Sequence, residues 1–201
     1  MEIEKGISWI EDLEDAKRKS KRSGKPILLF FHYKFCTGCI NTFGRVLSRD
    51  NVAGAINEGF IPVLFETTER PKEVDAYGID WTPTFIVSDE TGLESERWEG
   101  FLPEGSFLAH LDMGRARVAL KARDYARAEE LYNRVENNFR NTDQAPKAAY
   151  YAGIARYRAT NDTSKLTEAY ERLRGMYPES AWTIKASVWS KENIESLKMA
   201  A

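Results

Sequence analysis

The stretch "FFHYKFCTGCINTF", residues 30–43, decides which fold this sequence predicts. It contains both cysteines of the 201-residue chain, Cys36 and Cys39, three positions apart. The apolar run "PILLFF", residues 26–31, leads into it and is typical of a strand buried on both faces. Residues 36–47 have helical character. The pattern predicts a strand, a short loop and a helix that begins at the first cysteine.

A cysteine at the start of a helix has a specific chemistry. Its thiolate faces unpaired backbone N–H groups and the positive end of the helix dipole, which lowers its pKa below the free value of about 8.5. A second thiol one helical turn later can attack a mixed disulfide formed by the first. The spacing therefore favours thiol–disulfide exchange, with Cys36 as the exposed nucleophile and Cys39 as the buried resolving thiol.

Two other interpretations of the cysteine pair stay open. A structural zinc site needs four ligands, and the chain offers these two cysteines with His32, in the same loop, and His110, far along the sequence. Alternatively, both thiols are small buried hydrophobic side chains that happen to be neighbours. We expect no metal and no cofactor.

Working outward, strands alternate with helices. A helix is expected from Ser8, with Glu11 at capping-box spacing, to a stop at Gly24. A second buried strand covers residues 60–66, and a short helix runs from Pro71 to Gly78. The segments "TFIVS" (84–88) and "LESERW" (93–98) flank the turn "DETG" and predict an antiparallel hairpin. Together these elements predict a mixed α/β sheet.

The segment "GIDWTPTFIV", residues 78–87, places Pro83 between a short helix and a buried strand. Cis peptide bonds occur essentially before proline, and a cis bond here would bring backbone beside the reactive cysteine. We expect Pro83 to be cis, with its ring and the Thr82 backbone in contact with Cys36. The alternative is an ordinary trans proline that opens an edge strand.

After Phe101 the pattern changes, and from Glu104 onward only helical signals remain. Residues 128–139, "AEELYNRVENNF", align with residues 166–177, "LTEAYERLRGMY", at an offset of 38. A period of this size is typical of stacked helix–turn–helix repeats, although an irregular helical bundle would also fit. We expect one domain over residues 1–112 and an all-α domain over residues 113–201.

Composition limits the classes of function. The chain is 42% hydrophobic and its net charge is −2, which excludes wholesale disorder and gives no basic excess for nucleic acid. The run "KRKSKR", residues 17–22, is typical of a solvated helix end. No apolar stretch approaches the roughly 18 residues of a membrane span, and the acidic N-terminus does not resemble a secretory signal. We expect a cytoplasmic protein without nucleic-acid or membrane partners, in which thiols stay reduced and a close cysteine pair is reactive.

Residues 7–111 resemble the thioredoxin superfamily, because they combine the Cys-x-x-Cys at a helix start, the surrounding strands and helices, and "TPT" before a hairpin. The preceding "DLEDAKRKSKRSGKPILLFF" resembles a bacterial thioredoxin-like branch. The resemblance implies a thiol–disulfide oxidoreductase acting on protein thiols and disulfides, with a nucleophilic Cys36, a resolving Cys39 and a cis-Pro83 facing them. Supporting residues are expected around them: His32, Lys34, Phe35, Thr37, Gly38 and Thr82.

The sequence also departs from thioredoxin itself. Phe35 replaces the tryptophan before the first cysteine, and Thr37-Gly38 replaces Gly-Pro between the two cysteines. Phe30 occupies the position of a buried aspartate that helps to deprotonate the resolving thiol, so reduction by that route should be slower. His32 and Lys34 would stabilise the Cys36 thiolate if they point toward it.

The helical half resembles tetratricopeptide repeats, with "KARDYARAEELYNRV" (residues 121–135) matching the turn and second helix of one unit. This resemblance implies a concave surface for a protein partner; the alternative is that the helices only cover a face of the sheet. The expected fold is an α/β thioredoxin fold followed by an all-α helical-repeat region. The alternative function is a non-catalytic thioredoxin-like scaffold whose repeats bind a protein partner.

Overall fold

The computed structural model describes residues 6–200. The chain divides into two compact units, with the division between Val118 and Ala119. Helix α5 (Glu104–Lys121) contains this position. The domain boundary predicted after residue 112 falls inside the same helix and stays a prediction.

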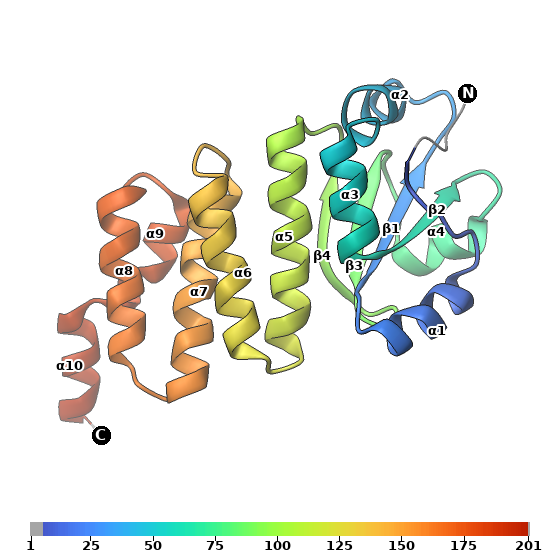
Figure 1. Ribbon diagram of the computed structural model, residues 1–201. Helices are drawn as coiled ribbons and strands as arrows, with labels where there is room; N and C mark the ends of the chain where they lie inside the picture. Colours follow the sequence, from blue (N-terminus) through green and yellow to red (C-terminus); the bar gives the residue numbers. More distant parts are fainter. Residues whose placement is uncertain (1–5, 201) are drawn as a thin grey trace. The chain divides into compact units, whose positions relative to one another are not determined.

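A four-stranded mixed sheet forms the centre of the first unit, as the sequence predicts (Figure 1). Its order is β2-β1-β3-β4, and the strands are β1 (Ile27–His32), β2 (Ile61–Glu66), β3 (Thr84–Ser88) and β4 (Glu94–Glu99). β1 is parallel to β2 and antiparallel to β3, and β3 and β4 form the expected antiparallel hairpin. All six residues of β1 are buried, because the strand is central and its apolar side chains face helices on both sides.

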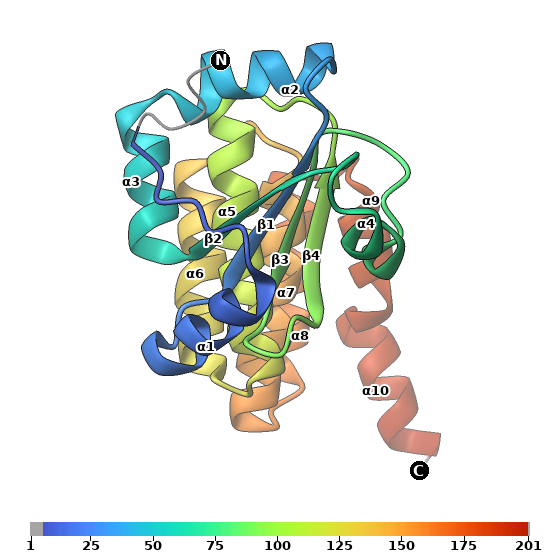
Figure 2. The same ribbon diagram turned by 90° about the vertical axis from the view of Figure 1, so that its right-hand side faces the viewer.

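Helices cover both faces of this sheet (Figure 2). Helices α1 (Leu13–Ser23) and α4 (Pro71–Tyr77) lie on one face, and α3 (Asp50–Gly59) and α5 lie on the other. Alternate residues of β1 therefore belong to two cores. Leu28 and Phe30 pack with residues of α3 and α5, whereas Ile27, Leu29 and Phe31 pack with residues of α1 and α4.

The start of α1 differs from the expected capping box at Ser8. The helix begins at Leu13, and the Asp12 side chain caps it by accepting a hydrogen bond from the Asp15 N–H at 2.6 Å. The backbone at Ile10 instead bridges Val63 alongside β2, which holds this segment extended. Helical geometry at Ser8 is incompatible with that bridge. The predicted stop at Gly24 is confirmed, with φ of 72° in the left-handed region.

The helix that carries the cysteines is confirmed over the predicted stretch, with one irregularity. Helix α2 (Thr37–Thr42) continues directly into a π-helical turn, η1 (Phe43–Leu47). Such turns occur often near functional sites. Phe43 of this turn packs against Phe30 of β1, with ring centroids 5.2 Å apart. The turn therefore anchors the cysteine helix on the central strand.

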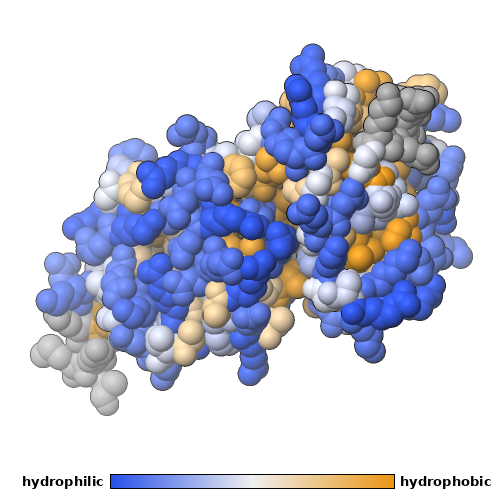
Figure 3. Space-filling view, viewed as in Figure 1, coloured by the Kyte–Doolittle hydropathy of each residue, from blue (hydrophilic) through white to orange (hydrophobic). Residues whose placement is uncertain are grey.

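The second unit is helical, and helices adjacent in sequence pack together from α6 to α9. Its elements are α6 (Tyr125–Asn138), α7 (Gln144–Thr160), α8 (Ser164–Met176), α9 (Ala181–Ala186), a 3-10 turn η2 (Ser187–Trp189) and α10 (Lys191–Ala200). Hydrophilic side chains cover most of α6 to α8 on the face that Figure 3 shows. None of the helices in the described part of the chain has the length and apolar character needed to cross a membrane.

Two features tie the helices of this unit together. The Arg172 guanidinium of α8 contacts the buried Glu136 carboxylate of α6, with Nε and Oε1 2.6 Å apart. Gly153 of α7 lies so close to α8 that an added Cβ would be 2.3 Å from the Ala169 Cβ. The small residue therefore sets how closely these two helices approach.

Candidate functional site around Cys36

The two cysteines occupy different environments at the start of α2. Cys36 is the N-cap residue and is partly exposed, whereas Cys39 is 1% exposed. The Cys36 sulfur accepts a hydrogen bond from the Cys39 N–H at 3.3 Å, which satisfies one of the free N–H groups at the helix start. Both thiols are free in this structure. One sulfur is thus accessible while the other lies beneath it.

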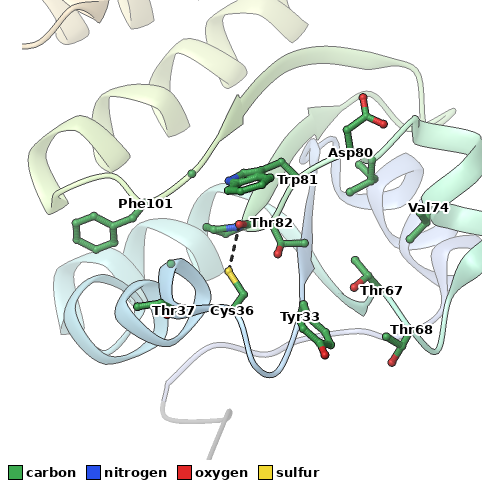
Figure 4. A pocket seen from close by; sticks show the side chains of 14 residues that line it. Tyr33, Cys36, Thr37, Thr67, Thr68, Val74, Asp80, Trp81, Thr82 and Phe101 are labelled. Atoms are coloured by element: carbon green, nitrogen blue, oxygen red, sulfur yellow. Dashed lines mark hydrogen bonds between the residues drawn. The ribbon is translucent and has the colours of Figure 1, made fainter.

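The Thr82–Pro83 segment faces Cys36 across the site (Figure 4). The Thr82–Pro83 peptide bond is cis. The Cys36 thiol donates a hydrogen bond to the Thr82 carbonyl, with 3.1 Å between sulfur and oxygen. A Cβ added to Gly38 would lie 2.9 Å from Pro83 Cδ and 3.6 Å from the Cys36 sulfur. The fold therefore brings Cys36, Gly38, Thr82 and Pro83 into one site.

The surroundings of Cys36 favour its ionised form. Burial opposes ionisation, but side-chain hydrogen bonds from Thr82 and Cys39 and the backbone N–H groups of Cys39 and Gly38 outweigh it. The pKa of Cys36 is therefore lower than that of an ordinary thiol. The thiolate is the reactive form of cysteine, so the partly exposed sulfur is the more nucleophilic of the two.

The pKa of Cys39 moves in the opposite direction. Burial, together with the neighbouring Cys36, raises it to about 12, although a hydrogen bond with the Tyr33 backbone opposes the shift. Phe30 of β1 lies among apolar residues. It occupies the position where the resemblance to thioredoxin places a buried aspartate, so no carboxylate at this position can accept the Cys39 proton. The buried thiol is therefore protonated at neutral pH.

His32 and Lys34 lie close to the cysteine loop but contact aromatic rings. His32 is buried, and its imidazole packs against the rings of Phe30 and Phe43, with centroids 5.7 and 5.4 Å away. The pKa of His32 is lowered, because burial disfavours the charged imidazole more than the nearby Glu66 and Glu69 favour it. The Lys34 ammonium lies over the ring of Phe35, 5.3 Å from its centroid. Stabilisation of the Cys36 thiolate by these two side chains stays a prediction.

A pocket of about 680 Å³ opens beside the Cys36 sulfur. Thr37, Gly38, Thr82 and Pro83 line it, as do several residues that the sequence did not single out: Tyr33, Thr67, Val74, Ile79, Trp81 and Phe101. In Figure 4, Phe101 lies on one side of Cys36 and Val74 on the other, with Trp81 between them. Phe35, which we expected at the site, is exposed and belongs to the loop before Cys36. Its position two residues before Pro83 was the one sequence signal that could have indicated Trp81.

The described residues contain no group of three or more histidine, cysteine or acidic side chains arranged to hold a metal ion. His110, considered above as a possible zinc ligand, lies in α5, where its ring stacks on Trp98 with centroids 5.0 Å apart.

A mixed sheet of this order, with a Cys-x-x-Cys pair at a helix start and a cis-proline opposite it, defines a protein of the thioredoxin-fold class. The model of the thioredoxin-like domain family matches residues 13–115. The chain belongs to this family. A comparison of this chain with curated proteins found no match.

Several solved structures are similar to part of the chain. A thioredoxin from Thermus thermophilus is 23% identical over 53% of this chain and 85% of its own, with a TM-score of 0.48. The oxidised C-terminal domain of Neisseria meningitidis DsbD is 22% identical over 50% of this chain and 94% of its own, with a TM-score of 0.43. A thioredoxin-fold protein from Helicobacter pylori is 17% identical over 70% of this chain and 96% of its own, with a TM-score of 0.49.

Proposed function

We propose that the protein is a thiol–disulfide oxidoreductase that acts on protein disulfides through Cys36 and Cys39. The observation that carries this proposal is the asymmetry of the pair. Cys36 is accessible, has a lowered pKa and faces a pocket, whereas Cys39 is buried one helical turn behind it. An inert buried pair would not combine an accessible low-pKa sulfur with a pocket.

The reaction has two exchange steps. The Cys36 thiolate attacks one sulfur of the substrate disulfide, forming a mixed disulfide and releasing the other sulfur as a thiolate. Cys39 then gives its proton to this thiolate and attacks the Cys36 sulfur. This step forms the Cys36–Cys39 disulfide and releases the second substrate thiol, so that two electrons have passed to the substrate. An external dithiol returns the pair to the reduced state.

Because the raised pKa of Cys39 leaves few Cys39 thiolates at neutral pH, we expect the second step to be the slower one. Release of the first substrate thiolate beside the pair supplies a base for the Cys39 proton. The apolar Phe30 offers no carboxylate for that task. We therefore expect mixed disulfides to persist longer than they would beside a buried aspartate.

The first testable prediction concerns the two thiols. Cys36→Ser should abolish reduction of a model protein disulfide, because the attacking sulfur is gone. Cys39→Ser should accumulate a covalent complex between the protein and its substrate, visible on a non-reducing gel and released by dithiothreitol. Equal reductase activity in the wild type and the Cys36→Ser variant would remove the proposed function.

The helical unit supports a second, separate proposal, that its helices form a tetratricopeptide-like stack in which α6 and α8 occupy equivalent positions. The C-cap N–H of Phe139 donates to the Val135 carbonyl at the end of α6, and that of Tyr177 donates to the Leu173 carbonyl at the end of α8. The two caps are related by the same 38-residue offset as the aligned sequences.

A protein partner at these helices, and the non-catalytic scaffold as an alternative function, stay predictions. Two thiols that alkylate no faster than a buried cysteine would favour the scaffold.

A further inference from the structure

Two aromatic side chains in the wall of the Cys36 pocket are unusually accessible. Trp81 is 63% exposed and Phe101 is 39% exposed. Both line the pocket that contains Cys36 (Figure 4). Exposed apolar side chains that gather at a pocket, rather than singly, mark a binding surface. The reaction described above requires neither ring, so the pair calls for a separate explanation.

Hydrogen bonds at the start of β3 hold the backbone of Trp81 and of the residue before Phe101 in place. The buried Thr84 hydroxyl donates to the Trp81 carbonyl at 2.8 Å. On the other side, the Gly100 N–H donates to the Pro83 carbonyl at 2.8 Å and fixes the residue before Phe101. The rings are therefore carried on backbone that is already ordered, and binding a ligand between them costs little further conformational entropy.

The dimensions of the pocket indicate the size of its occupant. A volume of about 680 Å³ lies in the range of pockets that hold a drug-sized molecule or several side chains. A small symmetrical disulfide would reach the sulfur but would leave Trp81, Phe101 and the opposite wall of Val74 and Ile79 uncovered. A polypeptide with a bulky apolar side chain next to its disulfide-bonded cysteine would cover these walls while its sulfur meets Cys36.

The charge of the pocket sharpens this description. Among the described lining residues, Asp80 carries the one charged side chain apart from the Cys36 thiolate. A substrate with acidic residues beside its cysteine would place like charges near Asp80, which disfavours binding. A substrate with apolar residues at these positions meets no such penalty.

We propose that Trp81 and Phe101 determine substrate specificity by selecting polypeptide disulfides whose cysteine has an aromatic or branched aliphatic neighbour in sequence. This inference rests on the proposed exchange reaction and adds the substrate class to it. The selection lies in the first step, where the occupied pocket brings the substrate sulfur to Cys36. The burial of one large apolar side chain can change the rate constant of that step by roughly tenfold or more.

The test measures single-turnover reaction of the reduced full-length protein with three peptides. Each peptide carries one cysteine disulfide-bonded to 5-thio-2-nitrobenzoate, and the residues beside the cysteine are Leu and Phe, two Ser, or two Glu. Attack by Cys36 forms the protein–peptide disulfide and releases the coloured thiolate. We expect the Leu/Phe peptide to react about tenfold faster than the Ser peptide, and the Glu peptide to react most slowly.

Variants assign the selection to the aromatic pair. Trp81→Ser and, independently, Phe101→Ser should each lower the ratio of the Leu/Phe rate to the Ser rate toward one. The matched control is Leu93→Ser, which removes a side chain that is 62% exposed in the β3–β4 turn, away from the pocket lining. This control should keep the wild-type ratio. Circular dichroism of each variant checks that it is folded.

The possible failures are distinguishable. Fast reaction of the wild type with all three peptides at equal rates would overturn the proposed selection and leave the exchange reaction standing. Loss of the ratio in Leu93→Ser as well as in the pocket variants would overturn the assignment to Trp81 and Phe101. If the wild type reacts with no peptide and does not reduce 5,5′-dithiobis(2-nitrobenzoate) either, both the exchange reaction and the selection are overturned.

Discussion

At the scale of single residues, the two cysteines show how position in one helix separates chemically identical groups. Cys36 at the N-cap gains hydrogen bonds that stabilise its thiolate, and Cys39 three residues later is buried. The two pKa values move in opposite directions for these reasons. Cysteine thereby supplies both the accessible nucleophile, Cys36, and a buried, protonated resolving thiol, Cys39.

This separation predicts a pH profile. The thiolate fraction rises as pH rises through the pKa, so a lowered pKa moves the alkylation curve of Cys36 to lower pH. In the Cys39→Ser protein, the rate of reaction with iodoacetamide should reach half its maximum at a lower pH than for a cysteine in a short unstructured peptide. In the Cys36→Ser protein, Cys39 should reach that point at a higher pH than the peptide cysteine, because burial, the largest cause of its raised pKa, is still present. Mass spectrometry of quenched samples measures both curves, and coincident curves would contradict the prediction.

Gly38 supports a second prediction at this scale. A methyl group there would press on Pro83 Cδ at 2.9 Å, so Gly38→Ala must displace either the proline or the start of α2. We expect a fall in the Cys36 exchange rate on the order of tenfold and a loss of about 1–3 kcal/mol in the free energy of unfolding.

Gly54→Ala is the matched control, because its added methyl would meet no atom within 4 Å. This change in α3 should raise the free energy of unfolding by about 0.5–1 kcal/mol and leave the exchange rate unchanged. Stopped-flow kinetics and urea denaturation measure the two quantities. A Gly38→Ala protein as active and stable as the Gly54→Ala protein would refute the close contact.

The sequence indicated some residues of the site and could not indicate others. Cys36, Cys39 and Pro83 were recognisable because their spacing and context carry the information. The exposure of Trp81 and Phe101 depends on two segments about 20 positions apart that meet only in the folded chain. The direction of the His32 side chain was equally hidden, because it depends on whether the last residue of β1 faces the cysteine helix or the solvent.

At the scale of elements, the strands were more predictable than the helix ends. The apolar run that became β1 had one compatible location, the centre of a sheet. Two side chains could cap the start of the first helix: Ser8, which has Glu11 at capping-box spacing, and Asp12. The bridge between Ile10 and Val63 excludes a helix at Ser8 and leaves Asp12 as the cap. This bridge joins residues 53 positions apart, so the local sequence could not predict it.

Helix packing in the second unit gives the prediction at this scale. Gly153→Ala would place a methyl 2.3 Å from the Ala169 Cβ, so α7 and α8 must separate. We expect a loss of about 1–3 kcal/mol in the free energy of unfolding. Gly175→Ala in α8, where nothing lies within 4 Å of the added methyl, should instead raise it by about 0.5–1 kcal/mol. Thermal and urea denaturation of both proteins test this, and equal stabilities would contradict it.

At the scale of the whole molecule, the division after Val118 predicts where the chain can be cut. A fragment that ends at Val118 should keep the sheet and the rapid alkylation of Cys36. A fragment that ends at Asp112 lacks Gly114, which lies against Val87, and Val118, which packs on the same core. We expect the shorter fragment to be less stable by about 1–3 kcal/mol.

Circular dichroism and urea denaturation of the two fragments, with the full chain as the control, measure the difference. A shorter fragment as stable as the longer one would place the domain boundary at residue 112, as first predicted from the sequence. An unfolded longer fragment would show that the helices after residue 118 are needed to stabilise the sheet.

The two outer strands of the sheet also bear on how the protein behaves in concentrated solution. Outer strands can recruit strands from other molecules and so begin fibrous aggregates. Residues near Ile10 cover part of β2, and β4 carries the sequence "ESERWE", in which three of the six residues are glutamates. Glu96 is buried and lies beside Arg117, whereas Glu94 and Glu99 are not buried. Two copies that met edge to edge along β4 would bring the carboxylates of Glu94 and Glu99 together. Charged side chains on an outer strand disfavour such pairing, so apolar substitutions at Glu94 and Glu99 should make a clear solution gel or precipitate more readily.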